Sequence, residues 1–172
     1  MRTFLVLLVI FVSSCGYTTR GFIYPESSII IKPVVNKIDI TAESRKYSDY
    51  VSFPILIENK LTNELVSKFN SEGNLKVVSQ DPKALQLTCA VEGYDRETLR
   101  YTESDAVSEQ RLRLRVHMKL TSGDGKVLQD KVVLGETTYY LTGANQKSES
   151  AAQLDLIDDT ARRISEAVTE EW

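Results

Sequence analysis

The chain has 172 residues, of which 42% are hydrophobic and 26% charged, and its formal net charge at pH 7 is −3. This length fits one domain with a tether and leaves no room for a second domain. The acidic balance argues against a general nucleic-acid binder, because neutralising phosphates requires a basic excess or an extended basic face. We therefore expect no nucleic-acid partner.

The N-terminus carries the pattern of an export signal. Arg2 is followed by an unbroken apolar run at residues 4–12, and small Ser13 and Ser14 lead to Cys15. The apolar run is too short to cross a bilayer, which needs roughly 20 residues. This order of charge, apolar core and small residues is typical of a secretory signal. An ordinary signal peptide cut elsewhere, with Cys15 as a leftover thiol, is the alternative.

The residues around Cys15 favour lipidation. Val12-Ser13-Ser14-Cys15 resembles the lipobox of bacterial lipoproteins, which implies that residues 1–14 are removed and that Cys15 is acylated. Two or more acyl chains hold a protein firmly on a membrane, whereas one chain anchors it marginally. Gly16 stands where an aspartate commonly retains lipoproteins in the inner membrane, so we expect the outer membrane, with the protein on its periplasmic side. Removing Arg2 from the 21 basic residues leaves 20 against 24 acidic ones, a formal charge of −4.

The first half of the mature chain predicts a tether, a strand, a loop and a helix. Residues 15–27 form the lipidated tether, and residues 28–172 form a single domain. The β-branched run at residues 28–35 predicts a first strand, placed near a sheet edge because Pro33 cannot donate a ladder hydrogen bond. A polar loop follows at residues 36–50. The next segment predicts an amphipathic helix that begins near Ser52, has Pro54 in its first turn and ends at Gly73. Its apolar stripe is Ile57, Leu61, Leu65 and Phe69.

The second half predicts a meander of strands and a closing helix. A short strand at residues 75–79 precedes an alternating strand that starts at Leu85, in which Gly93 permits a bulge before residues 94–101. A polar turn at residues 102–108 leads to a strand at residues 112–120, and a tight turn at residues 122–125 leads to the last strand at residues 126–141. The final helix begins near Ser148 or Ser150, with its apolar positions at Leu154, Ile157, Ala161, Ile164 and Val168. The predicted class is α+β: a mostly antiparallel sheet of four to five strands with two amphipathic helices packed on one face.

The reactive side chains give no catalytic or metal site. Cys89 alternates with apolar residues, which predicts a buried thiol, and lipidation of Cys15 would leave it without a disulfide partner. His117 has no cysteine or acidic cluster near it in the sequence. Nucleophile elbows, metal-spaced clusters and glycine-rich phosphate loops are absent from the sequence, so we expect no enzyme activity and no cofactor.

One strand presents a row of basic side chains. In residues 111–120 the apolar side chains alternate with Arg111, Arg113, Arg115, His117 and Lys119. Alternate residues on one face lie about 6.6–6.8 Å apart, so the guanidinium groups could contact successive phosphates or carboxylates. The alternative is a solvated sheet face whose cations pair with Glu92, Glu97, Asp130 or Glu136 on neighbouring strands.

Taken together, these segments resemble the LptE family of lipopolysaccharide-assembly outer-membrane lipoproteins. The matching segments are Cys15-Gly16-Tyr17, residues 31–36, Glu64-Leu65, residues 85–94, residues 112–120, Tyr140 and residues 151–168. The resemblance implies a nonenzymatic protein that partners the LptD β-barrel and binds lipopolysaccharide on its way to the outer leaflet. It also implies two ligand-binding cations at one end of the fold. Their nearest matches by position are Arg100 and Lys147. Because alternate turns of a meander share an end, these two residues are expected near each other.

A second class of function remains open at this point. A periplasmic lipoprotein that regulates another envelope machine, such as a peptidoglycan synthase or a lipid transporter, would combine the same anchor, tether and small domain. The tether favours the barrel partner, because about a dozen residues reach no further than roughly 40 Å from the membrane.

Overall fold

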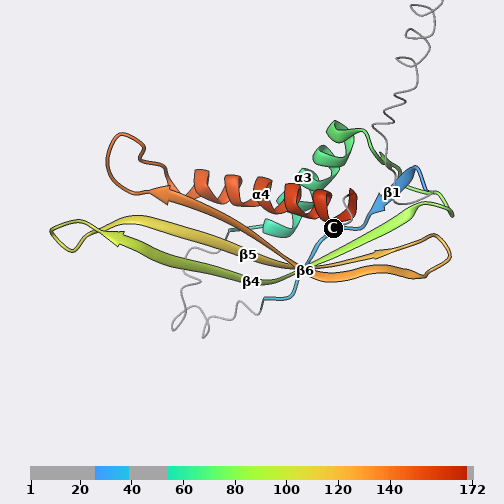
Figure 1. Ribbon diagram of the computed structural model, residues 1–172, viewed down its shortest axis with the longest axis horizontal. Coiled ribbons are helices and arrows are strands. Elements are labelled where there is room, and N and C mark those ends of the chain that lie inside the picture. The colour runs from blue at the N-terminus through green and yellow to red at the C-terminus, as the bar shows by residue number, and fades with distance from the viewer. Residues whose placement is uncertain (1–25, 39–53, 170–172) are drawn as a thin grey trace, which may run out of the picture.

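The structure, a computed structural model, describes residues 26–38 and 54–169. The predicted signal, Cys15 and most of the tether lie outside the described residues, as do Ser52 and most of the predicted loop. Two helices lie along one face of a long twisted sheet (Figure 1). The elements are β1 (Ser28–Ile31), β2 (Val35–Asn36), α3 (Ile57–Glu72), β3 (Lys76–Val77), β4 (Leu85–Tyr101), β5 (Val107–Thr121), β6 (Val127–Tyr140) and α4 (Glu149–Thr169).

The sheet is mixed, which corrects part of the predicted class. Within residues 26–38 and 54–169 it has six strands: β3-β1-β4-β5-β6 in this order, and β2, which pairs with β4 beside β1. β1 pairs parallel with both β3 and β4, and β2 also pairs parallel with β4. Only β4, β5 and β6 form the predicted antiparallel meander. The parallel pairs arise because α3 carries the chain back across the sheet between β1 and β3, and such a crossover returns a strand in the same direction.

The predicted first strand is two strands, of which β1 does not lie at an edge, whereas β2 pairs with β4 alone among the described residues. β1 ends at Ile31 and β2 begins at Val35, so Pro33 falls in the break between them. Pro33 therefore costs the sheet no hydrogen bond, which removes the reason for placing this strand at an edge. β1 is instead enclosed, because Lys76 N donates to Ser27 O on one side and Lys32 N donates to Leu87 O on the other, both at 2.9 Å.

The meander follows the predicted alternation closely. Leu112, Leu114, Val116, Met118 and Leu120 of β5 are all fully buried. The register of β4 against β5 shifts between Val91 and Gly93, which confirms the predicted bulge. The β5–β6 turn closes with a hydrogen bond from Gly125 N to Ser122 O, as predicted for a tight hairpin.

Both helices pack on the same face, as predicted. α3 packs against α4 and against β1, β2 and β3, while α4 covers β5 and β6. The predicted stripe of α3 is buried, and Gly73 ends this helix in the left-handed conformation with a φ of 67°. The predicted start was wrong: the helix begins at Ile57, after Leu56, so Pro54 lies before the helix. Pro54 is buried there, which explains its presence without a helical role.

The prediction was also wrong for one apolar position of α4. Leu154 is 59% exposed, whereas Ile157, Ala161, Ile164 and Val168 are buried as predicted. At about 100° per residue, position 154 lies at the margin of the buried arc, about 20° from buried Ala161 but about 160° from buried Leu156. The spacing of three between Leu154 and Ile157 predicted that both side chains are buried, but only Ile157 is.

Cys89 is buried, as its alternation predicted. Its side chain belongs to the hydrophobic core and forms no disulfide among the described residues. Burial in this apolar environment raises the pKa of the thiol to about 12. The thiolate form is therefore disfavoured at neutral pH, which makes Cys89 a packing residue.

Asp159 fastens α4 to the edge strand β6. Its Oδ2 accepts hydrogen bonds from Glu136 N of β6 at 2.9 Å and from Arg163 Nε at 2.7 Å, and its Oδ1 accepts one from Arg162 Nη2 at 2.6 Å. Burial opposes ionisation of this carboxyl, but these donors outweigh it, so the pKa of Asp159 lies below its ordinary value of 3.8. A lowered native pKa stabilises the fold above the unfolded pKa, and this stabilisation is lost as the pH falls through the native pKa.

An Asp159→Asn variant tests that contribution. We expect it to unfold at a lower temperature than the parent protein at pH 7, by a free energy of about 1–2 kcal/mol, because the charge-assisted hydrogen bonds are weakened. As the pH falls below 3.8, the difference should shrink, since the parent carboxyl becomes protonated as well. Thermal melts of both proteins between pH 7 and pH 2.5 measure this, and a pH-independent difference would contradict it.

Candidate partner and ligand surface

The predicted basic row lies on the face of the sheet opposite the helices. We call this the outer face: the side of β4, β5 and β6 on which the odd-numbered side chains of β5 from Arg111 to Lys119 lie. The even-numbered side chains of this segment form the core beneath α4. The cross-strand neighbours of the row are therefore the matching residues of β4 and β6, including Asp95, Glu97 and Asp130.

Most cations of the row have an acidic partner. Glu97 Oε2 lies 2.9 Å from Arg113 Nη2 and 3.9 Å from Arg111 Nη1. Asp130 lies 4.0 Å from the Lys119 Nζ. These contacts match the solvated-face interpretation for Arg111, Arg113 and Lys119. Of the four acids proposed as partners, Glu136 turns away to Arg163 of α4.

His117 lies beside two of the acids expected to pair with the basic row, Glu92 and Asp130. Its Nε2 lies 2.5 Å from Asp130 Oδ1 and its Nδ1 lies 3.6 Å from Glu92 Oε1. The two acids approach opposite nitrogens of the ring, so they cannot share one metal ion with it. Among the described residues there is no cluster of histidine, cysteine and acidic side chains that could hold a metal. The neighbours come from β4 and β6, far from His117 in the chain.

Arg115 is the exception in the row. Its side chain is exposed and has no ion pair with any described residue. The guanidinium lies over the backbone of Gly93: a Cβ placed on Gly93 would stand 2.9 Å from Cζ and 3.0 Å from Nε of Arg115. A glycine at the bulge therefore makes the space into which this cation folds.

Apolar side chains surround Arg115 on the outer face. Leu134 of β6 is directly opposite Arg115, and the adjacent row runs from Val35 through Ala90 and His117 to Val132. Leu134, Val132 and Val35 are 44%, 54% and 57% exposed. The centre of the outer face thus combines one unpaired cation with uncovered aliphatic groups.

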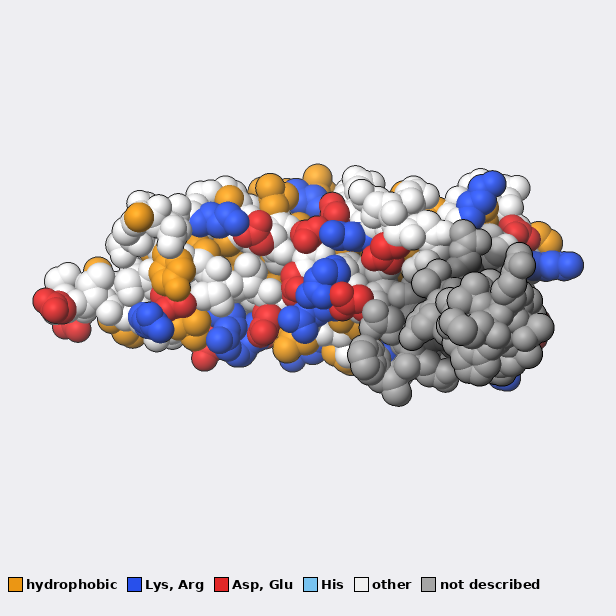
Figure 2. All heavy atoms as spheres, turned by 45° about the horizontal axis from the view of Figure 1, so that its top comes forward, with side chains coloured by type: hydrophobic (Ala, Val, Ile, Leu, Met, Phe, Trp, Pro, Cys, Tyr) orange, Lys and Arg blue, Asp and Glu red, His pale blue; other side chains and the backbone are white. Residues whose placement is uncertain are grey.

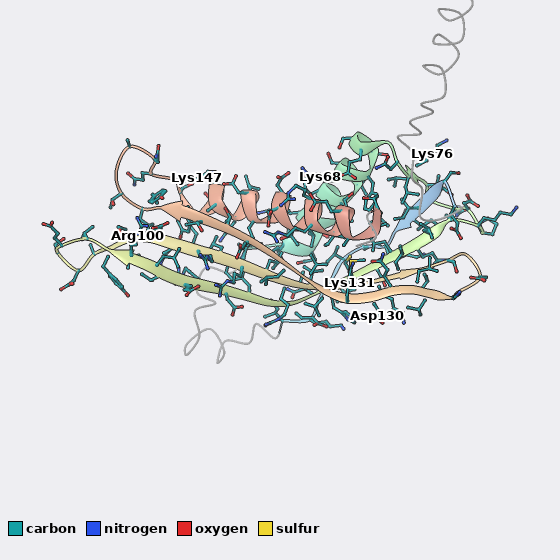
Figure 3. All side chains as sticks on the ribbon, viewed as in Figure 1. Lys68, Lys76, Arg100, Asp130, Lys131 and Lys147 are labelled. Carbon is teal, nitrogen blue, oxygen red and sulfur yellow. The ribbon has the colours of Figure 1, made fainter. Side chains whose placement is uncertain are left out.

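Arg100 and Lys147 lie at the same end of the sheet (Figure 3). Arg100 belongs to β4, and Lys147 lies in the segment between β6 and α4. Register joins Arg100 to Glu109, Glu109 to Tyr140, and Tyr140 to Gln146. Three strand spacings of about 4.8 Å separate the backbones of Arg100 and Gln146, or roughly 14 Å. The predicted common end is therefore present, but one phosphate could be shared only by two fully extended side chains.

Each of these two cations already has a partner. Arg100 Nε lies 3.0 Å from Oε2 of Glu109, which is only 7% exposed, without the alignment of a hydrogen bond. Lys147 Nζ pairs with Asp155 on the first turns of α4. A ligand phosphate would have to displace both carboxylates. Arg100 also has a structural role, because it is the counter-ion of a nearly buried acid.

The opposite end of the sheet carries a cleft of about 760 Å³ that sequence reasoning did not foresee. It lies between the residues just before β1, the turn at Asp81 and the β5–β6 turn. Asp81 accepts hydrogen bonds from Ser28 Oγ and Lys83 N, and Asp124 from Ser122 Oγ and Lys126 N. These carboxylates hold the turns, which leaves them no evident ligand role.

The helix side of the molecule has interspersed charges. Figure 2 shows blue and red side chains mixed over the helices, with few orange ones between them. Ion pairs such as Lys68 with Asp158 and Arg96 with Glu149 account for part of this pattern. None of the helices in the described ranges has the length and apolarity that crossing a bilayer requires.

Three solved structures share this fold at low sequence identity. A minor lipoprotein from Acinetobacter baumannii is 18% identical over 83% of this chain and 91% of its own, with a TM-score of 0.51. An uncharacterized lipoprotein B from Nitrosomonas europaea is 18% identical over 90% of each chain, with a TM-score of 0.50. A hypothetical protein from Chlamydia trachomatis is 8% identical over 83% of this chain and 95% of its own, with a TM-score of 0.52. The fold is thus shared with three bacterial proteins, two of which are described as lipoproteins.

The family follows from the sequence model that matches. Residues 38–170 match the model of LptE, described as lipopolysaccharide-assembly. The chain therefore belongs to the LptE family, a family of noncatalytic lipoproteins of lipopolysaccharide assembly. No curated protein matches the chain in a direct sequence search.

Proposed function

We propose that this protein is an outer-membrane lipoprotein, anchored through acylated Cys15 on the periplasmic side, that partners an LptD-like β-barrel. Its task is to help deliver lipopolysaccharide to the outer leaflet, without catalysis and without a cofactor. The observation that carries the proposal is the family match over residues 38–170, joined to a fold shared with lipoproteins. The outer face supports it, because the lumen of a membrane β-barrel is polar and suits a surface of paired charges.

Isolation of the full-length protein from its own cells in gentle detergent tests the partnership. We expect mass spectrometry to identify a large outer-membrane β-barrel in near-equal amount, and the barrel should remain through a second purification step. A matched control is an unrelated outer-membrane lipoprotein carrying the same tag, which should not recover the barrel. Recovery of a peptidoglycan synthase or an inner-membrane transporter in the barrel's place would assign the protein to another envelope machine.

Lipopolysaccharide binding is the second part of the proposal. Arg100 and Lys147 are the proposed ligand cations at their end of the sheet, whereas Arg111, Arg113 and Lys119 of the basic row are already paired with acids and Arg115 stands alone among them, so this row is not part of the proposed ligand site. Arg100 is paired with Glu109 and Lys147 with Asp155, so these two acids should compete with the ligand for the cations. An Arg100→Ala, Lys147→Ala double variant should retain less lipopolysaccharide after purification than the parent protein.

The complementary double variant Glu109→Gln, Asp155→Asn keeps both cations and removes their carboxylates. We expect it to retain as much lipopolysaccharide as the parent protein or more, because each charge-assisted contact to a phosphate no longer competes with an internal acid. Quantifying bound lipopolysaccharide per protein, with melts to verify folding, measures both variants. Equal retention in all three proteins would remove Arg100 and Lys147 from the ligand site.

A further inference from the structure

Most charged side chains of the outer face are paired with opposite charges, and Arg115 at its centre is the arginine of the row without an ion pair among the described residues. The cations Lys37, Arg111, Arg113, Arg115 and Lys119 share it with the carboxylates Glu92, Asp95, Glu97 and Asp130, so the charges of the face nearly cancel. A surface with this balance has no net attraction for a polyanionic glycolipid or an anionic membrane, since attraction to such surfaces needs an excess of positive charge. The face therefore suits a partner that is itself of mixed character.

Arg115 has the properties of an interface anchor. Its guanidinium is unpaired among the described residues, lies over Gly93, and has exposed Leu134 opposite it and exposed Val132 in the next row. Residues that dominate protein–protein affinity are enriched in arginine, lie near the centre of the interface and are ringed by contacts that exclude water. Leu134, Val132 and Val35 are placed to form such a ring.

The chemistry of the partner follows from this arrangement. A guanidinium makes its strongest contacts with a carboxylate, in a bidentate geometry that two N–H groups provide. The surrounding aliphatic groups would shield that pair from water, provided that the partner also offers apolar side chains around its carboxylate. The salt bridges of Glu97 and Asp130 would then lie at the rim, where ion pairs contribute little.

We propose that the outer face is the docking surface for a protein partner and that Arg115 is its anchor, pairing with one carboxylate set among apolar side chains. The identity of that partner as the lumen wall of the β-barrel rests on the proposed function. The opposite side of the sheet is occupied by α3 and α4 (Figure 1), and neither of these helices, the two in the described part of the chain, covers the outer face.

Site-specific crosslinking in the organism's own cells tests the docking face. A photoreactive residue at Leu134 should give an adduct with the β-barrel, identified by mass spectrometry. The matched control position is Leu154, which is also an exposed leucine but lies on α4, on the helix side. A barrel adduct from Leu154 and none from Leu134 would overturn the docking face and leave the proposed function standing. An adduct from Leu134 with a different protein, lost in an Arg115→Ala background, would support the face and overturn the barrel as partner.

Substitution of Arg115 tests the anchor. Arg115→Ala should lower the amount of co-purified partner at least about tenfold, as expected of a dominant interface residue. Lys119→Ala removes a neighbouring cation of the same face that already has Asp130 beside it, and it should change the amount less than about twofold. Both variants should have the same melting temperature as the parent protein, since both side chains are exposed. Equal losses in the two variants would overturn Arg115 as the anchor. Restoration of an Arg115→Glu variant by a carboxylate-to-arginine change in the partner would support the pairing directly.

Discussion

A Gly135→Ala variant is expected to be markedly less stable than the parent protein, although it adds a single methyl group. Gly135 lies in β6 beneath α4, and a Cβ placed on it would stand 2.8 Å from Cβ and 2.9 Å from Cα of Thr160. Thr160 is fully buried on the helix, so the methyl group meets backbone that cannot rotate away. Forcing a helix off a well-packed sheet typically costs about 1–3 kcal/mol, which thermal melts or urea titrations measure.

Gly93→Ala is the matched control for this prediction. Gly93 is also a buried strand glycine, but its added methyl group would meet only the end of the Arg115 side chain. A flexible side chain can move at little cost, so Gly93→Ala should melt close to the parent protein. The expectation for Gly135 would be wrong if the two variants lost equal stability. A Thr160→Ala change in the Gly135→Ala background should recover only part of the loss, because the Thr160 Cβ contact remains.

A Cys15→Ser variant is expected to lose its lipid completely and to leave the detergent phase in a Triton X-114 partition. The serine hydroxyl cannot carry the thioether-linked lipid that the lipobox resemblance implies. Each buried methylene contributes about 0.8 kcal/mol to membrane binding, so losing two or more chains removes the anchor. Labelling cells with radioactive palmitate measures the acylation, and the partition measures its effect on the protein apart from any partner.

Cys89→Ser is the control for the anchor, because it removes the other cysteine of the chain. It should still incorporate palmitate and partition with detergent, although burial of a hydroxyl in the core will lower its stability. Incorporation of palmitate into the Cys15→Ser variant, or its absence from the parent protein, would contradict the lipobox interpretation.

The local patterns of the chain predicted its elements well where one face is buried. Strict alternation in residues 112–120 identified every core residue of β5, and the spacing of Ile57, Leu61, Leu65 and Phe69 identified the stripe of α3. Such patterns are direct consequences of strand and helix periodicity against a single apolar layer. The helix start was wrong because proline and serine near position 52 have the chemistry of a helix N-terminus even where tertiary packing begins the helix later.

Strand partners were harder to predict because they depend on nonlocal contacts. A short apolar run such as residues 28–31 gives no indication of whether its neighbours will be parallel or antiparallel. The parallel insertion of β1 between β3 and β4 therefore had no sequence signal.

For the candidate surfaces too, the local pattern could be predicted from the sequence, whereas the contacts between distant residues could not. The row of alternating cations was evident in the sequence, but the separation of Arg115 from its paired neighbours depends on Gly93, which lies 22 positions earlier in the chain. A glycine within a strand is a general sign of a close approach, yet it does not identify the group that approaches. The acids beside Arg100 and Lys147 likewise became apparent only when the strand register and the position of α4 were known.

The enclosed position of β1 has a mechanical consequence. The tether joins the fold at this strand, so any pull from the anchor proposed at Cys15 enters the domain through β1 and not through an edge. β1 is bonded on both sides, by Lys76 N to Ser27 O and Val78 N to Ile29 O toward β3 and by Lys32 N to Leu87 O toward β4. A tensile load would have to shear the hydrogen bonds to β3 and those to β4 together, whereas a terminal edge strand could be pulled off one hydrogen bond at a time. An anchor at Cys15 would therefore pull on a strand that is hydrogen-bonded on both sides.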